Sequence, residues 1–214
     1  MQTSPDVLSQ VDHLVYATTD LERGIADIEQ LIGVRPSPGG QHPGRGTHNA
    51  LLSLGPNVYL EIIARDPAQP EPATPRVFGL DTLTAPRLVT WSAKGTQLDQ
   101  LYRLAADSNI ALGAVSAGSR RRPDGVLLSW SFTDPAVEIG DGIVPFFIDW
   151  GTSPHPAQSA ARGATLIAFR AEHPDAQRVQ RVLQQLGLEL TVSNGSLPTL
   201  IATIEGPRGR IELR

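Results

Sequence analysis

The first sixty residues alternate between two hydrophobic periodicities. Residues 11–18 are mostly apolar, which predicts a buried strand. Residues 21–32 then place leucine and isoleucine three and four positions apart, which predicts a helix with one apolar face. A stretch rich in proline and glycine (34–46) follows, and we expect it to be a loop. Two further strands, 48–54 and 58–64, complete a strand–helix–strand unit.

The same order of elements recurs twice more along the chain. We therefore predict an α+β fold of repeated βαβββ units, in which curved mixed sheets surround a central cavity. Units 8–66 and 86–150 form one domain over residues 8–150, and a shorter third unit, 163–214, packs on it. A single unit leaves one face of its sheet uncovered, so the proline-rich stretch 65–86 is expected to connect units within one assembly.

Composition limits the possible partners and location. The chain has 214 residues, of which 40% are hydrophobic and 19% are charged, as in ordinary globular proteins. A net charge of −4 gives no reason to expect nucleic acid or an anionic membrane as a partner. Cysteine is absent, which excludes disulfides and thiolate chemistry. With no leader-like start and no apolar run long enough to span a bilayer, we expect a cytoplasmic protein without a membrane partner.

The candidate chemistry lies in the first unit. His13 lies in the opening strand, His48 begins a later strand, and Glu61 lies in the middle of an apolar strand. A buried carboxylate needs a partner, and two imidazoles with one carboxylate suit zinc, iron, nickel or manganese. If the first and last strands pair, His13 and Glu61 become neighbours on one face. The alternatives are a hydrogen-bonded core histidine and a solvated glutamate.

A second candidate feature is the loop 118–125, which contains three consecutive arginines. Guanidinium groups bind carboxylates and phosphates through paired hydrogen bonds, so this loop and Arg45 predict a small anionic organic ligand. A solvated hairpin tip is the alternative reading. Asn49 and Trp130 add hydrogen bonding and an aromatic wall, unless they are a turn residue and core filler. The expected ligand contacts are Arg45, Asn49, Arg121, Arg122 and Trp130.

The remaining histidines carry less weight. His42 lies in a Gly/Pro-rich stretch and is expected to be exposed, whereas His173 precedes a predicted helix and is expected to help begin it. His155 follows a strand and is a weaker candidate for the cavity. Neither a serine nucleophile elbow nor a nucleotide-binding loop is found in the sequence.

The order of several motifs resembles the vicinal oxygen chelate superfamily and, within it, the glyoxalase-like domain family. The motifs are DHLVYA (12–17), GTHNALLSLG (46–55), YLEIIA (59–64), RRPDG (121–125) and PFFIDW (145–150). The superfamily includes glyoxalase I, methylmalonyl-CoA epimerase, extradiol dioxygenases and antibiotic-resistance proteins. The resemblance implies a cavity in which a metal ion acts as Lewis acid on a chelating substrate.

The resemblance also implies a ligand set, from which this sequence departs. His13 and Glu61 match the ligand positions of the first unit. Aligned by strand, the second unit offers Arg87 and Phe147, neither of which suits a metal. A full set therefore requires His48 or, from the third unit, Glu212.

Two functions follow from these expectations. The first is a divalent-metal-dependent lyase, isomerase or dioxygenase that acts on a small oxygenated carboxylic acid. In it, His13, His48 and Glu61 hold the metal, and Glu61 and His48 are the candidate catalytic residues. The alternative is a metal-free protein of the same fold that sequesters a small molecule. The odd number of units further suggests that the third unit pads the first two or pairs into a homodimer.

Overall fold

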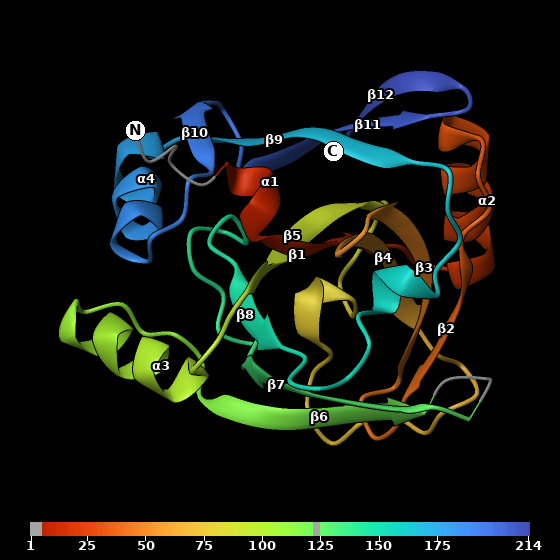
Figure 1. Cartoon of the computed structure of the whole chain (residues 1–214), viewed down its shortest axis with the longest axis horizontal. Coiled ribbons are helices and arrows are strands. Elements are labelled where there is room, and N and C mark those ends of the chain that lie inside the picture. Colours follow the sequence, from red (N-terminus) through yellow and green to blue (C-terminus); the bar gives the residue numbers. More distant parts are fainter. Residues whose placement is uncertain (1–5, 122–124) are drawn as a thin grey trace.

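The computed structural model describes residues 6–121 and 125–214, which form two β-sheets with helices against them (Figure 1). The larger sheet has the strand order β2-β3-β4-β1-β5-β8-β7-β6, and the smaller one the order β10-β9-β11-β12. The strands of the larger sheet are β1 (Val11–Ala17), β2 (Ser37–His42), β3 (Thr47–Gly55), β4 (Val58–Arg65), β5 (Arg87–Lys94), β6 (Val115–Arg121), β7 (Leu127–Thr133) and β8 (Phe146–Asp149). Those of the smaller sheet are β9 (Thr165–His173), β10 (Thr191–Asn194), β11 (Thr199–Gly206) and β12 (Gly209–Leu213).

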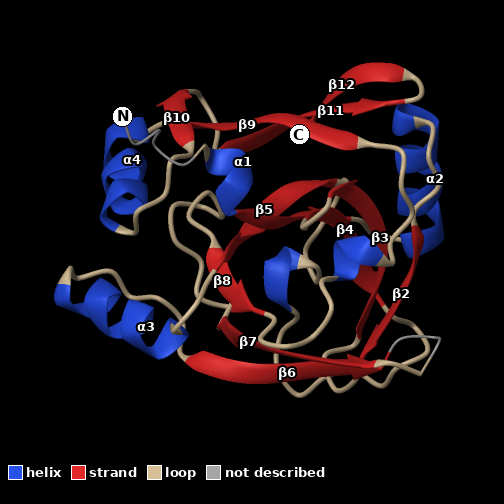
Figure 2. Cartoon of the chain, in the orientation of Figure 1, coloured by secondary structure: helices blue, strands red, loops and turns tan. Residues whose placement is uncertain are grey.

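The helices lie outside the larger sheet, except for two short turns (Figure 2). They are α1 (Val7–Gln10), α2 (Leu21–Ile32), α3 (Leu98–Asp107), α4 (Ala176–Gln185) and the 3₁₀ turns η1 (Val77–Gly79) and η2 (Pro156–Gln158). Helix α2 begins where Asp20 caps the amide of Arg23 and ends at Gly33, which adopts a left-handed conformation. Within the described residues, no helix combines the length and the apolar character that crossing a bilayer requires.

The larger sheet curls into a nearly closed barrel, as Figure 1 shows. Its two end strands meet where the guanidinium of Arg120 on β6 donates a hydrogen bond to the carbonyl of Gly39 on β2. Sequence patterning predicted loops over both segments, and this was wrong. Proline and glycine depress the strand signal, yet they are tolerated on edge strands, where the partner on one side is missing.

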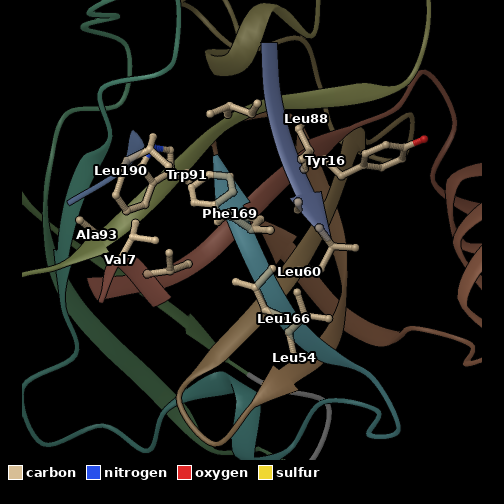
Figure 3. Close-up of a cluster of buried hydrophobic side chains, with 14 of the residues drawn as sticks. Val7, Tyr16, Leu54, Leu60, Leu88, Trp91, Ala93, Leu166, Phe169 and Leu190 are labelled. Carbon is tan, nitrogen blue, oxygen red and sulfur yellow. The ribbon is translucent and has the colours of Figure 1, made fainter. Parts of the chain in front are cut away.

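The main core lies outside the barrel, between its wall and the smaller sheet (Figure 3). Trp91 on β5 is fully buried there and packs edge-on against Phe169 of β9, with 5.4 Å between the ring centroids. The indole Nε1 of Trp91 donates to the carbonyl of Ile143 at 2.8 Å. The smaller sheet thus covers the outer face of the barrel, as a sheet with one apolar face requires.

Side chains of β1 and β4 alternate between this outer core and the barrel interior. Leu14 and Leu60 belong to the outer core, whereas Val15 and Ile63 pack inside with Leu80, which follows η1. At another point of the interior, Ala157 of η2 belongs to a cluster with Leu51, Tyr59 and Ala160. The two 3₁₀ turns therefore fill much of the barrel, and the polar residues of the candidate site lie between them and the strands.

Candidate functional site

His13 is the centre of a buried polar cluster inside the barrel. Its side chain lies between two aromatic rings: Tyr59 stacks on it at 4.6 Å between centroids, and Phe146 approaches edge-on at 5.5 Å. Burial, reinforced by the charges of Asp12 and Glu61, raises the pKa of Tyr59 well above its usual value, so the phenol stays neutral. The imidazole of His13 is 3% exposed and held in one orientation.

Asp12 orients His13 by a hydrogen bond between Oδ1 and the imidazole Nδ1 at 2.8 Å. The same carboxylate accepts from the indole Nε1 of Trp150 at 3.1 Å and lies 3.1 Å from Nε2 of His155. Because Nδ1 of His155 accepts from the amide of Ala157, Nε2 is the nitrogen that carries a proton and donates it to Asp12.

The charge state of Asp12 follows from these contacts. Burial raises the pKa of Asp12, but the hydrogen bonds and charges of His13 and His155 outweigh burial and lower it to about 2. The ionised carboxylate can only accept, so Nδ1 of His13 carries a proton. The opposite nitrogen, Nε2, is thereby turned toward Glu61.

Glu61 on β4 faces His13 across a short gap. Its Oε2 atom lies 3.9 Å from Nε2 of His13, and its side chain is nearly buried. Its other oxygen, Oε1, accepts from the amide Nδ2 of Asn49 at 2.6 Å. The predicted proximity of His13 and Glu61 is present in the structure, and Asn49 holds the other oxygen of the carboxylate.

His42 also belongs to the cluster, although the sequence suggested that it is exposed. It ends β2, is half-buried, and places Nε2 4.0 Å from Oε1 of Glu61 and 3.3 Å from Nδ2 of Asn49. Burial lowers the pKa of His42, the charges of Arg120 and Arg45 act in the same direction, and Glu61 opposes them. His42 was missed because the strand that carries it was read as a loop.

The structure does not bring His48 to this cluster. Asn49 and His48 are consecutive on β3, so their side chains point to opposite faces, and Asn49 is the inward one. Nδ1 of His48 lies instead 3.9 Å from a carboxylate oxygen of Asp66. The other proposed ligand, Glu212, is exposed on β12 and forms ion pairs with Arg170 and Arg214.

The residues that the second unit places near His13 differ from Arg87 and Phe147, which were expected when its strands were aligned with those of the first unit. His13 pairs across the sheet with Ser92 of β5, not with Arg87, and Ser92 pairs in turn with Phe146. Phe147, the predicted counterpart, points into the outer core. The second unit therefore offers a hydroxyl and a phenyl ring near His13.

The side chains around His13 and Glu61 do not fit the three-ligand metal centre that the sequence predicted. Nε2 of His13 and Oε2 of Glu61 are close enough to contact one ion. The other oxygen of Glu61, Oε1, is hydrogen-bonded to Asn49, and His42 lies 4.0 Å from that oxygen. Among the residues that the structure describes, no three histidine, aspartate or glutamate side chains are arranged to hold a metal. A zinc, iron, nickel or manganese site usually has at least three protein ligands, so no chemical step is assigned to a metal here.

A cavity of about 1000 Å³ lies beside this cluster, on the other side of Phe146. Arg45, one of the predicted ligand contacts, lines it, with its guanidinium 5.3 Å from the ring centroid of Phe132. Phe78 of η1 also lines the cavity and packs on Phe146, with 6.0 Å between centroids. The cavity is thus aromatic where it approaches His13.

The other predicted contacts lie elsewhere. Arg121 is exposed and donates to the carbonyl of Gly125 at 2.7 Å, and Arg122 lies outside the described residues. Trp130 packs against Trp150, with 5.2 Å between centroids, and so supports the partner of Asp12. Arg120, which was not selected, is buried whereas its neighbour Arg121 is exposed, because alternate residues of β6 face opposite sides.

Comparisons with known proteins agree with this architecture. A family model described as a glyoxalase-like domain matches residues 11–187. A hypothetical protein from Staphylococcus aureus is similar in structure with a TM-score of 0.66 at 12% identity, covering 93% of this chain and 91% of that one. Methylmalonyl-CoA epimerase from Mycobacterium tuberculosis gives a TM-score of 0.44 at 17% identity, covering 70% and 93%. A search of curated proteins found no match.

Proposed function

This chain belongs to the glyoxalase-like domain family, of the vicinal oxygen chelate superfamily, and from that premise we propose that it is an acid–base isomerase or lyase. Its substrate is an oxygenated carboxylic acid. One observation carries the proposal: a buried imidazole nitrogen and a buried carboxylate oxygen face each other at 3.9 Å, and each is held by a hydrogen bond to its other polar atom.

The geometry supports proton transfer between substrate and protein. A substrate atom beside the pair can lie about 3 Å from both Nε2 of His13 and Oε2 of Glu61. Glu61 takes a proton from the carbon next to a carbonyl, and the electron pair of that C–H bond moves onto the carbonyl oxygen. Nε2 of His13, when protonated, then returns a proton to the enolate.

The residues behind the pair keep both groups in place during this exchange. Asp12 stabilises the imidazolium that forms when His13 is protonated, because its ionised carboxylate accepts the Nδ1 proton. Asn49 prevents Glu61 from turning away. Arg45, which lines the adjoining cavity, binds the carboxylate of the substrate.

A second candidate function is supported by how deeply His13 and Glu61 are buried. His13 and Glu61 are 3% and 7% exposed, and the ring of Phe146 stands between His13 and the cavity. A protein that only binds and sequesters an acid would use the same cavity without proton transfer.

Hydrogen–deuterium exchange tests the proposal. A panel of 2-hydroxy and 2-oxo acids is incubated with the protein in D₂O, and loss of the proton signal at the carbon beside the carbonyl or carboxylate is followed by NMR. We expect exchange with at least one acid, and we expect His13→Gln and Glu61→Gln to slow it by about a hundredfold or more. His48→Gln is the matched control, because this histidine lies outside the pair.

The outcomes separate the two functions. Exchange that survives both substitutions contradicts the catalytic roles of His13 and Glu61. Binding without exchange, measured by calorimetry on the same acids, supports sequestration. Repeating the assay after dialysis against a chelator and then with added zinc, manganese or iron shows whether the exchange depends on a metal.

A further inference from the structure

The cavity beside the polar cluster is larger than a small acid requires. Its volume is about 1000 Å³, which is at the upper end of the roughly 300–1,000 Å³ that drug-sized ligands occupy in proteins. A small oxygenated acid at Arg45 fills only one end of it. The remaining volume is therefore available to a further part of the substrate.

The third unit of the chain forms the outer wall of this cavity. Residues 197–200, which lead into β11, line it together with Arg214 at the end of the chain. The opposite wall at this end is the loop 134–138. The cavity thus runs from Phe146, beside His13, to the smaller sheet.

Two large apolar side chains are exposed on this outer part. Leu197 is 70% exposed and Val137 is 44% exposed, and both line the cavity. Leu200 on β11 and the rings of Phe78 and Phe146 continue the apolar lining inward. Apolar side chains that gather on one exposed surface are characteristic of ligand-binding sites, because a ligand removes them from water.

The charged residues that line the cavity differ between its two ends. Asp134 and Glu138 line its outer part, and Arg214, which lines the same part, is paired with Glu212 at 3.1 Å, so this part disfavours a carboxylate. Arg45 lines the part near the polar cluster, and its charge acts on His42, which lies 4.0 Å from Glu61. Within the described residues, Arg45 takes part in no ion pair, and its guanidinium is available to an anion.

We propose that the substrate is a carboxylic acid with an extended apolar body. Its acid end lies at Arg45 beside Phe146, and its apolar body extends between Val137 and Leu197 to the third unit. This inference rests on the proposed function for the position of the acid end. It also assigns a role to the third unit, which supplies the wall that contacts the apolar body.

Calorimetry with propanoate, hexanoate and decanoate tests the inference on the full chain. We expect affinity to increase with chain length, by up to about fourfold for each fully buried methylene. Leu197→Gln is expected to weaken decanoate binding by about threefold and to leave propanoate unchanged. Leu104→Gln is the matched control, since Leu104 is a similarly exposed leucine on α3 outside the cavity.

Two further variants test the orientation of the ligand. Arg45→Gln should weaken all three acids by the same factor, because it removes only the contact with the carboxylate. Arg87 also lines the cavity, and a loss of propanoate binding in Arg87→Gln instead of Arg45→Gln would overturn the proposed orientation. Equal affinity for propanoate and decanoate, or equal effects of Leu197→Gln and Leu104→Gln, would overturn the inference itself.

These results are distinguishable from a failure of the proposed function. Chain-length dependence that requires Leu197, without any proton exchange, supports the ligand class and rejects the catalytic role. Proton exchange on short acids without chain-length dependence supports the catalytic role and rejects the proposed ligand class.

Discussion

Asp12 and His13 are consecutive residues of β1, and their side chains are hydrogen-bonded to each other at 2.8 Å. In a regular strand, consecutive side chains point to opposite faces. Here the pairing of β1 with β5 shifts register between Val11 and His13, so that Asp12 lies in a β-bulge. The bulge allows Asp12 to reach both His13 and the Trp150 indole. It also explains why Val11 lies in the outer core and not on the face of His13.

The pKa of Asp12 predicts a loss of stability in acid. Since hydrogen bonds from His13 and His155 outweigh burial and lower its pKa from 3.8 to about 2, the folded chain favours the ionised carboxylate. This contribution is fully present above the unfolded value and is lost as pH falls from 3.8 to 2; its size is about 2 kcal/mol. Urea unfolding at a series of pH values should show that Asp12→Asn removes this dependence. Asp107→Asn, at an exposed site on α3, should keep it.

His42 predicts a second pH effect, in a higher range. Burial lowers its pKa below the model-peptide value of 6.5, so the unfolded chain takes up a proton before the folded chain does. The free energy of unfolding should therefore fall as pH decreases below about 6.5, and His42→Gln should flatten this part of the curve. The same urea series, run on the unaltered chain and on His42→Gln, measures it; His48 is left in place because its charge also lowers the pKa of His42. An unchanged slope in His42→Gln would show that His42 takes up its proton equally in both states.

The backbone at Gly39 leaves no room for a side chain. A methyl group on Gly39 would overlap Oδ1 of Asn49, the residue that holds Glu61. Gly39→Ala should therefore cost about 1–3 kcal/mol of unfolding free energy and weaken the Asn49–Glu61 contact. In a double-mutant cycle, Asn49→Ala removes the overlapping atom, so the double variant should be more stable than the sum of the single effects indicates. Strict additivity would contradict this account.

The alternating and continuous apolar patterns were sufficient to predict most of the fold. Strands such as β1 and β4 are buried on both faces and carry long apolar runs, and α2 carries its own cap and stop signals. The strand β2 was missed because proline and two glycines interrupt it, and β6 because glycine and two arginines replace an apolar pattern at the edge where the barrel closes. Edge strands take part of their stability from a tertiary contact that no local pattern encodes.

The site was predictable only as far as strand periodicity determines it. His13 and Glu61 were expected to meet because β1 and β4 pair, and they do. His48 was preferred to Asn49 because its chemistry suits a metal, but a shift of one residue along β3 reverses the face. Asp12 could not be predicted as a partner of His13, since the bulge that turns it is a property of the pairing with β5.

Trp91 connects the barrel to the smaller sheet and predicts a large effect on stability. Trp91→Phe keeps an aromatic ring against Phe169 but leaves the buried carbonyl of Ile143 without its donor. The expected cost is about 1–3 kcal/mol from this group alone, with more from the lost volume. Denaturant unfolding measures it, and Trp130→Phe, at a half-buried ring, is the control. A cost for Trp91→Phe no greater than that of the control would contradict this role.

Phe146 separates His13 from the large cavity, and its removal should expose the imidazole. The ring packs edge-on against His13 and against Phe78, and it lines the cavity on its other side. Phe146→Ala should join the space beside Nε2 of His13 to the cavity. Because the ring is only half-buried, we expect a stability cost below the roughly 3–5 kcal/mol of a fully buried phenylalanine.

Acylation by diethyl pyrocarbonate, followed by peptide mass mapping, measures the exposure of His13 directly. The yield at His13 should rise several-fold in Phe146→Ala, while the yield at the partly exposed His48 serves as an internal reference. Phe132→Ala is the matched control, because Phe132 lines the same cavity from β7 and its loss enlarges the cavity without uncovering His13. Equal yields at His13 in both variants would show that Phe146 is not the barrier, and that ligands reach the His13–Glu61 pair by another route.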